Sequence, residues 1–268
     1  MLPLVLDELV RQAANVWSLA PVKWRPSEPT AEEEAMITRE ATPNQFDKFG
    51  LKAGMVDAWK RGECERICLE CDLGRVIAFT TGKIPLEFWG RVLQSFGASH
   101  GKPWRIVWFA SEAVRCFPDV GKEMGPEHVN GGYTSPCSAD GIFIYRKEEA
   151  SRVLIHELMH AACLDEKGWS LPDREAMVET WAELILVALA SKGDGRTAAT
   201  LWAKQAQWVA DSNHRALKNG VEDASDYAWR YLVGRHGMYK RLGVEIPEPS
   251  THSPKSSRFT HPDLEPRR

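Results

Sequence analysis

Residues 153–165 read VLIHELMHAACLD, a stretch in which two histidines four positions apart flank a glutamate. Apolar residues on both sides of the motif recur at the spacing of an amphipathic helix that faces a protein core. Residues four apart on an α-helix differ by about 40° of rotation and one turn of rise, so His156 and His160 point the same way. Two neutral imidazoles on one helical face provide half of a tetrahedral zinc site.

Glu157 supplies a second element of this chemistry. It lies about 100° around the helix from His156, where its carboxylate can reach a water on the metal without being a ligand. Zinc lowers the pKa of its bound water to roughly 7, and a nearby carboxylate can take the proton as the water attacks a carbonyl. The motif therefore predicts Zn²⁺ as cofactor and Glu157 as general base.

A catalytic zinc site needs a third protein ligand, because the fourth position belongs to water. Glu166 lies where a metzincin has its third histidine, but that pattern needs a glycine where this chain has Cys163. The stretch VETWAELI (178–185) offers a better candidate, Glu179, on a second helix that can pack antiparallel to the first after a short turn. Glu183, one turn further on, is the next candidate for the third ligand, and if Glu179 binds the metal it is placed to accept the free N–H of a ligand histidine.

HELMH together with ETWAE resembles the active-site helices of the gluzincin, or thermolysin-like, group of zinc metallopeptidases. The resemblance spans these two helices and does not extend to the first 100 residues. It implies that His156, His160 and Glu179 bind zinc, that Glu157 is the general base, and that Glu183 orients a ligand histidine. The substrate would be a protein or peptide.

The segment from GPEHVNGGYT (125–134) through GIFIYRKEEASRVLIHELMH (141–160) is similar to uncharacterised peptidases encoded by large DNA viruses. In zincins an edge strand above the active-site helix pairs with the extended substrate. The resemblance implies that this strand is formed here by Asn130, Gly131, Gly132, Tyr133 and Thr134. Two adjacent glycines would let a substrate backbone approach closely.

Gluzincins also place a tyrosine or histidine from a later helix over the developing oxyanion, where a preorganised donor can contribute about 3 kcal/mol. The candidates here are Tyr227, which is slightly favoured, and Tyr231, with His236 and Tyr239 behind them. No motif fixes the choice between them.

The periodicity along the chain predicts an α+β protein of zincin type. A small mixed sheet with an edge strand over the active-site helix is followed by a mainly helical C-terminal part. The expected strands are 76–81, 105–111, 129–134 and 141–145, and the expected later helices are 85–97, the histidine helix closed by Gly168, 171–190, 197–218 and 223–241. The expected regions are a helical N-terminal part (1–60), the peptidase domain (61–245) and a flexible tail rich in proline and serine (246–268).

Composition limits the choice of partner and compartment. A net charge of −3 over 268 residues argues against nucleic acid. A membrane is not expected either, because no apolar run reaches the ~18 residues needed to cross one, and no signal peptide is recognisable. The six cysteines are then expected to be reduced thiols in the cytoplasm or another intracellular compartment. Cys64, Cys68 and Cys71 have the spacing of a radical-SAM iron–sulfur motif, but their charged surroundings favour ordinary thiols.

Alternatives to a peptidase remain open at this point. The histidines could be hydrogen-bonded core residues, and Glu175, Glu179 and Glu183 a solvated helical stripe. Besides the zinc metallopeptidase, two functions are compatible with the motif. One is a non-catalytic structural or virion-associated protein that retains a zincin fold, and the other is a DNA-associated protease.

Overall fold

The computed structural model describes residues 2–42, 47–98, 101–165 and 168–266. The chain forms two compact units, each assembled from separate stretches of sequence. The sheet unit consists of Pro21–Val114 and Asn130–Leu164, and the helical unit of Met1–Ala20, Arg115–Val129 and Asp165–Pro266. The histidine helix belongs to the sheet unit and the ETWAE helix to the helical unit.

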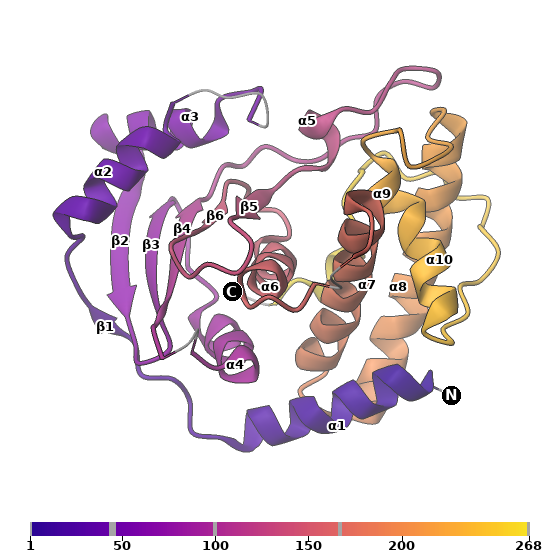
Figure 1. Cartoon of the computed structure of the whole chain (residues 1–268), viewed down its shortest axis with the longest axis horizontal. Coiled ribbons are helices and arrows are strands. Elements are labelled where there is room, and N and C mark those ends of the chain that lie inside the picture. The colour runs from indigo at the N-terminus through magenta and orange to yellow at the C-terminus, as the bar shows by residue number, and fades with distance from the viewer. Residues whose placement is uncertain (1, 43–46, 99–100, 166–167, 267–268) are drawn as a thin grey trace. The chain divides into compact units, whose positions relative to one another are not determined.

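A six-stranded mixed sheet with the order β1-β2-β3-β4-β6-β5 organises the sheet unit (Figure 1). β3, β4 and β6 run parallel, while β1, β2 and β5 pair antiparallel with their neighbours. The strands are β1 (Arg25–Pro26), β2 (Glu65–Glu70), β3 (Gly74–Thr80), β4 (Trp104–Phe109), β5 (Gly132–Thr134) and β6 (Ile142–Ile144). The α+β class and the small mixed sheet are confirmed, with β5 at one edge.

Helices cover both faces of this sheet. On one face Phe79 of β3 and Phe109 of β4 stack with centroids 5.4 Å apart and pack with residues of α2 (Ala31–Glu40) and α3 (Leu51–Lys60). On the other face Trp108 contacts Trp89 of α4 (Leu86–Phe96) at 5.3 Å, and α6 (Ala150–Ala161) packs against β5 and β6. Burial on both faces explains why β3 and β4 read as nearly continuous apolar runs.

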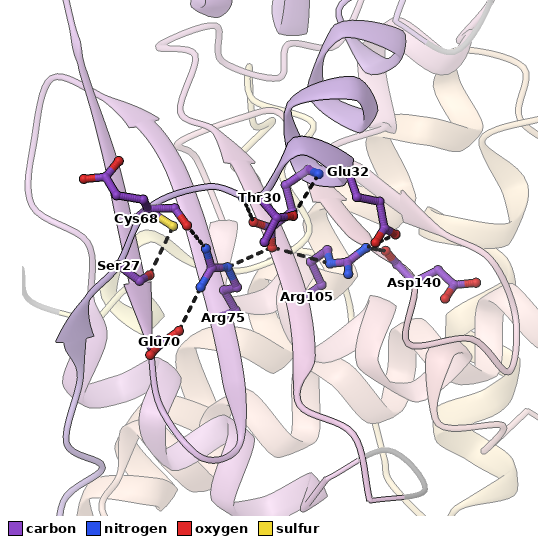
Figure 2. A network of polar contacts seen from close by, with 10 residues as sticks. Ser27, Thr30, Glu32, Cys68, Glu70, Arg75, Arg105 and Asp140 are labelled. Carbon is purple, nitrogen blue, oxygen red and sulfur yellow. Dashed lines mark hydrogen bonds and ion pairs between the residues drawn. The ribbon is translucent and has the colours of Figure 1, made fainter.

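Two arginines on neighbouring strands fasten α2 to the sheet, as Figure 2 shows. Arg75 and Arg105 are register partners, and the buried carboxylate of Glu33 lies 2.8 Å from Nε of Arg75 and 3.6 Å from Nε of Arg105. Thr30 and Glu33 form a capping box in which each side chain accepts the backbone N–H of the other. The acidic start of α2 is therefore an anchor rather than a solvated helical face.

The helical unit has its own apolar core. Its elements are α1 (Leu4–Ser18), α5 (Pro126–Val129), α7 (Leu171–Ala190), α8 (Gly195–Lys218), α9 (Trp229–Leu232), α10 (Gly234–Arg241) and the 3₁₀ turn η1 (Pro262–Leu264). α7 begins with a side-chain cap, because the Ser170 hydroxyl accepts the N–H of Asp173 at 3.2 Å. The single helix expected over 223–241 is instead the two short helices α9 and α10.

The C-terminal segment packs into the helical unit, which corrects the expectation of a flexible tail over 246–268. Phe259 and Leu264 are buried, and the Phe259 carbonyl accepts hydrogen bonds from Gln205 and Arg235, both at 3.0 Å. The Ser257 hydroxyl donates to the His128 carbonyl at 2.6 Å. A few well-placed apolar and hydrogen-bonding residues are enough to order a segment whose average composition is typical of disorder.

Among the helices that the structure describes, none combines the length and apolar character needed to cross a membrane.

Candidate metal centre

The two histidines of α6 converge on one point. Nε2 of His156 lies 3.1 Å from Nε2 of His160, and the rings meet edge to face with centroids 4.8 Å apart. Both side chains are buried. The start of the helix is fixed by Trp89, whose indole N–H donates to the Ser151 hydroxyl at 3.0 Å. The inward-facing pair is therefore held on a packed helix rather than on a loop.

The spacing of the pair fits a tetrahedral zinc ion. With Zn–N bonds of about 2.05 Å, two ligand nitrogens at the tetrahedral angle lie about 3.3 Å apart, close to the 3.1 Å between these rings. The same distance suits a hydrogen bond between one protonated and one unprotonated ring nitrogen. A metal ion could replace that hydrogen bond with little movement of either ring.

The sheet unit by itself does not complete a zinc site. Among its described residues, no third side chain of a metal-ligating type joins His156 and His160. Catalytic zinc usually takes three protein ligands. Within this unit the described residues therefore supply two histidine ligands.

Glu157 lies beneath the edge strand of the sheet. Its side chain is buried, and a Cβ atom built on Gly132 of β5 would lie 3.4 Å from Glu157 Oε1. The same Cβ would lie 2.5 Å from Cγ1 of Val153 and 2.7 Å from the carbonyl oxygen of Phe143. β5 can pass this close to α6 only because position 132 has no side chain.

The register of β5 determines which of its backbone groups face the open edge. The Tyr145 N–H donates to the Gly131 carbonyl at 2.9 Å, and Gly132 pairs with Ile144 in the same antiparallel ladder. Because hydrogen-bonded and non-hydrogen-bonded pairs alternate, the N–H and C=O groups of Gly132 and Thr134 point away from β6. The edge strand expected at 129–134 is confirmed over the shorter range of β5.

Tyr133 faces the opposite side of the sheet from Glu157. Its ring stacks on Phe143 at 5.1 Å, and its hydroxyl lies 3.0 Å from Nζ of Lys52, which is 2.9 Å from Glu40. This lysine is almost completely buried. Tyr133 therefore anchors β5 to α3, and Asn130 is fixed in a similar way, because its carbonyl accepts from Arg146 at 2.9 Å.

The Gly132→Ala substitution is expected to destabilise the protein by about 1–3 kcal/mol, because the added methyl group overlaps Val153 and the Phe143 carbonyl. Urea denaturation monitored by tryptophan fluorescence measures the loss. Gly54→Ala in α3 is the matched control, because a Cβ there meets nothing within 4 Å and alanine favours a helix. Equal stability of the Gly132→Ala variant and the wild type would show that β5 and α6 are not packed this closely.

A disulfide ties the tip of the β5–β6 hairpin to the end of α6. It joins Cys137 to Cys163, with Cα atoms 4.6 Å apart, so the expectation that all six cysteines are reduced is wrong for this pair. α6 ends at Ala161 rather than near Gly168. Cys163, with φ of 59°, occupies the left-handed position of a Schellman motif that usually holds glycine.

The acids of α7 have different surroundings within the helical unit. The Glu183 carboxylate accepts hydrogen bonds from Gln205 at 2.7 Å and from Tyr239, and it forms an ion pair with Arg235. Burial raises the pKa of Glu183 to about 7, with Arg235 opposing and the Glu179 carboxylate adding to the rise. The interactions of Glu183 therefore fix α7 within its own unit.

Glu179 and Glu175 lie one and two turns before Glu183 on α7. Glu179 is fully buried and close enough to Glu183 for its charge to act on that carboxyl group. Glu175 is half-buried and lies near the hydroxyl of Tyr231, because its charge contributes, after burial, to raising the pKa of that phenol. Both carboxylates therefore belong to the helical unit.

The two tyrosines considered for the oxyanion lie side by side in the helical unit. The ring of Tyr227 is 5.9 Å from that of Tyr231, which stacks on Phe259 at 5.8 Å. Of the two, Tyr231 is the one whose pKa the charge of Glu175 helps to raise, after burial. The other two candidates have different surroundings. His236 is exposed, and the Tyr239 hydroxyl donates a hydrogen bond to Glu183.

The three closely spaced cysteines do not form a metal site. Cys68 lies in β2 and Cys64 directly precedes it. The two positions are four apart, which corresponds to about 13 Å in an extended strand. Burial raises the pKa of all three thiols, including Cys71. These cysteines are therefore protonated thiols that pack against their neighbours. Their spacing reflects the strand β2, which was not expected from sequence.

The structure brings together His156, His160, Glu157 and the backbone of Gly132 in one unit, and Glu175, Glu179, Tyr227 and Tyr231 in the other. The disulfide and the roles of Lys52 and Arg235 could not be predicted from sequence, because no local motif marks them. Comparison of the chain with known protein families, with curated proteins and with solved structures gives no match.

Proposed function

We propose that this protein is a zinc-dependent metallopeptidase of gluzincin type. The main support is the 3.1 Å approach of the two Nε2 atoms of the HELMH motif. Next to this pair lies Glu157, a buried carboxylate under an edge strand. A pair of convergent imidazoles, an adjacent base and an open strand edge are the parts that hydrolysis of a peptide by an activated water requires.

The zinc ligands in this proposal are His156, His160 and a carboxylate of α7. Glu179 is our first choice, as the resemblance to gluzincins implies, and Glu175 is the alternative. Glu183 is not chosen, because both of its oxygens accept hydrogen bonds from Arg235, Tyr239 and Gln205 within the helical unit.

A bound zinc ion would lower the pKa of a water to roughly 7 and polarise the substrate carbonyl. Glu157 accepts the proton of the attacking water and returns it to the leaving amine. The outward N–H and C=O groups of Gly132 and Thr134 pair with the extended substrate backbone and hold its scissile bond beside Glu157. Tyr231, or Tyr227, donates a hydrogen bond to the developing oxyanion.

Zinc content and peptide cleavage test the proposal together. The purified chain is expected to retain about one zinc ion after dialysis, and His160→Gln to lose it, because two protein ligands hold zinc far more weakly than three. Glu179→Gln and Glu175→Gln, compared in the same assay, identify the third ligand. Zinc without cleavage of any member of a peptide library would favour the non-catalytic zincin alternative, and a wild type without zinc would refute the metal site.

A further inference from the structure

We propose that the Cys137–Cys163 disulfide is a thiol–disulfide exchange site that controls how firmly the edge strand and the histidine helix are held together. The disulfide spans 26 residues of sequence, a stretch that contains β6, α6, both histidines and Glu157. The loss of zinc affinity expected below rests on the proposed function, whereas the change in backbone protection does not.

The two cysteines meet at the backbone of His160. The carbonyl of His160 accepts the N–H of Cys137 at 2.9 Å and the N–H of Cys163 at 3.1 Å. One residue comes from the hairpin and the other from the end of α6, and the disulfide joins their side chains. The covalent bond therefore holds a hydrogen-bonded junction centred on a residue of the candidate metal site.

Reduction would loosen this junction for two reasons. Both cysteines have left-handed backbone conformations, each with φ of 59°, which side-chain-bearing residues adopt at a cost. His160 lies in the last turn of α6, which ends at Ala161, and terminal helical turns fray when their capping contacts are lost. Without the disulfide, the last turn of α6 and the hairpin tip are expected to separate more often.

The disulfide is accessible to a reductant. Cys137 is exposed and Cys163 is half-buried. A thiolate of a small dithiol attacks Sγ of Cys137, which breaks the protein disulfide and releases the Cys163 thiolate, which takes up a proton. The second thiol of the reagent then displaces Cys137 and closes a cyclic disulfide. The protein gains two electrons and two protons, and the dithiol loses them.

Hydrogen exchange of the whole chain tests the inference without reference to metal. Incubation with dithiothreitol is expected to raise the exchange rate of the amides of Cys137, Cys163 and Tyr133, the β5 residue whose N–H faces β6, about tenfold or more, while circular dichroism stays unchanged, because the opening is local. Equal exchange in the oxidised and reduced proteins would overturn the proposal. So would alkylation of Cys137 and Cys163 in protein purified without reductant.

Zinc binding provides the second readout. The Cys137→Ser, Cys163→Ser double variant removes the disulfide without leaving thiols that could bind zinc, and its zinc Kd is expected to rise about tenfold, as after loss of groups that orient a ligand. Cys116→Ser, which removes an exposed free cysteine, is the control and should match the wild type. An unchanged Kd in the double variant would refute the link to the metal site. If neither the wild type nor the variants bind zinc, the proposed function fails. Hydrogen exchange then still decides whether the disulfide holds the hairpin tip and the end of α6 together.

Discussion

The Glu157→Gln variant is expected to cleave peptides about 10²–10⁴-fold more slowly than the wild type while keeping its full zinc content. Glutamine has nearly the same shape as glutamate, so the packing below Gly132 is preserved. It cannot accept the proton of the attacking water, and position 157 is not one of the proposed ligands. The comparison requires kcat/KM on one peptide substrate and the zinc stoichiometry of the same preparations.

Glu87→Gln is the matched control for this experiment, because Glu87 is an exposed carboxylate on α4 of the same unit. It should leave both kcat/KM and zinc content unchanged. Equal activity of Glu157→Gln and the wild type would exclude Glu157 as the general base. Loss of zinc from Glu157→Gln would show instead that this carboxylate is itself a ligand.

The Arg235→Met variant is expected to lose about 3–5 kcal/mol of folding free energy, because it leaves the Glu183 carboxylate buried without its counter-charge. Arg235 and Glu183 are both fully buried. The guanidinium also donates to the Phe259 carbonyl at 3.0 Å, so its removal affects both α7 and the C-terminal segment. Urea denaturation at fixed pH measures the difference.

The pH dependence of stability distinguishes two causes of the Arg235→Met effect, the lost charge pairing and the lost packing. The folded-state pKa of Glu183 is already raised to about 7 from an ordinary value of 4.5, and removal of Arg235 raises it further. A raised folded-state pKa gives stability that is present at low pH and lost as pH rises. The loss of folding free energy in Arg235→Met should therefore be larger at pH 8 than at pH 5.

A second substitution tests the same explanation. Adding Glu183→Met to Arg235→Met should restore much of the stability. Arg61→Met, in an exposed pair with Glu63, should leave the urea midpoint unchanged. A deficit of the same size at both pH values would contradict the electrostatic explanation.

The elements around the histidine helix could be predicted from sequence because their patterns are local. β3 and β4 read as apolar runs, α4 ends before a glycine, and Ser170 caps α7. β2 was missed because its six residues include three charged side chains and a cysteine, with Ile67 and Leu69 as its aliphatic residues. The end of α6 was misplaced because Cys163 occupies a position where glycine is the usual signal.

The candidate site was predictable only where its residues share one helix. The spacing of His156 and His160 predicts that their side chains converge, and their Nε2 atoms lie 3.1 Å apart in the structure. The disulfide could not be predicted, because six cysteines without a secretory signal favour free thiols and do not determine a pairing. The partners of Glu183 lie on α8 and α10, more than 20 residues away in sequence, and no periodicity connects them.

The interleaving of the two units determines the order in which they can be completed on the ribosome. The sheet unit needs no described residue beyond Leu164, so it can fold while the rest of the chain is still being synthesised. α1 is made before the sheet unit, but its packing partners α7 and α8 follow that unit in the chain, so α1 must wait for both. During this interval the apolar face of α1 is exposed on the nascent chain. A chaperone could bind this face, which consists of the residues that are buried in the folded protein, Leu6, Val10 and Ala13.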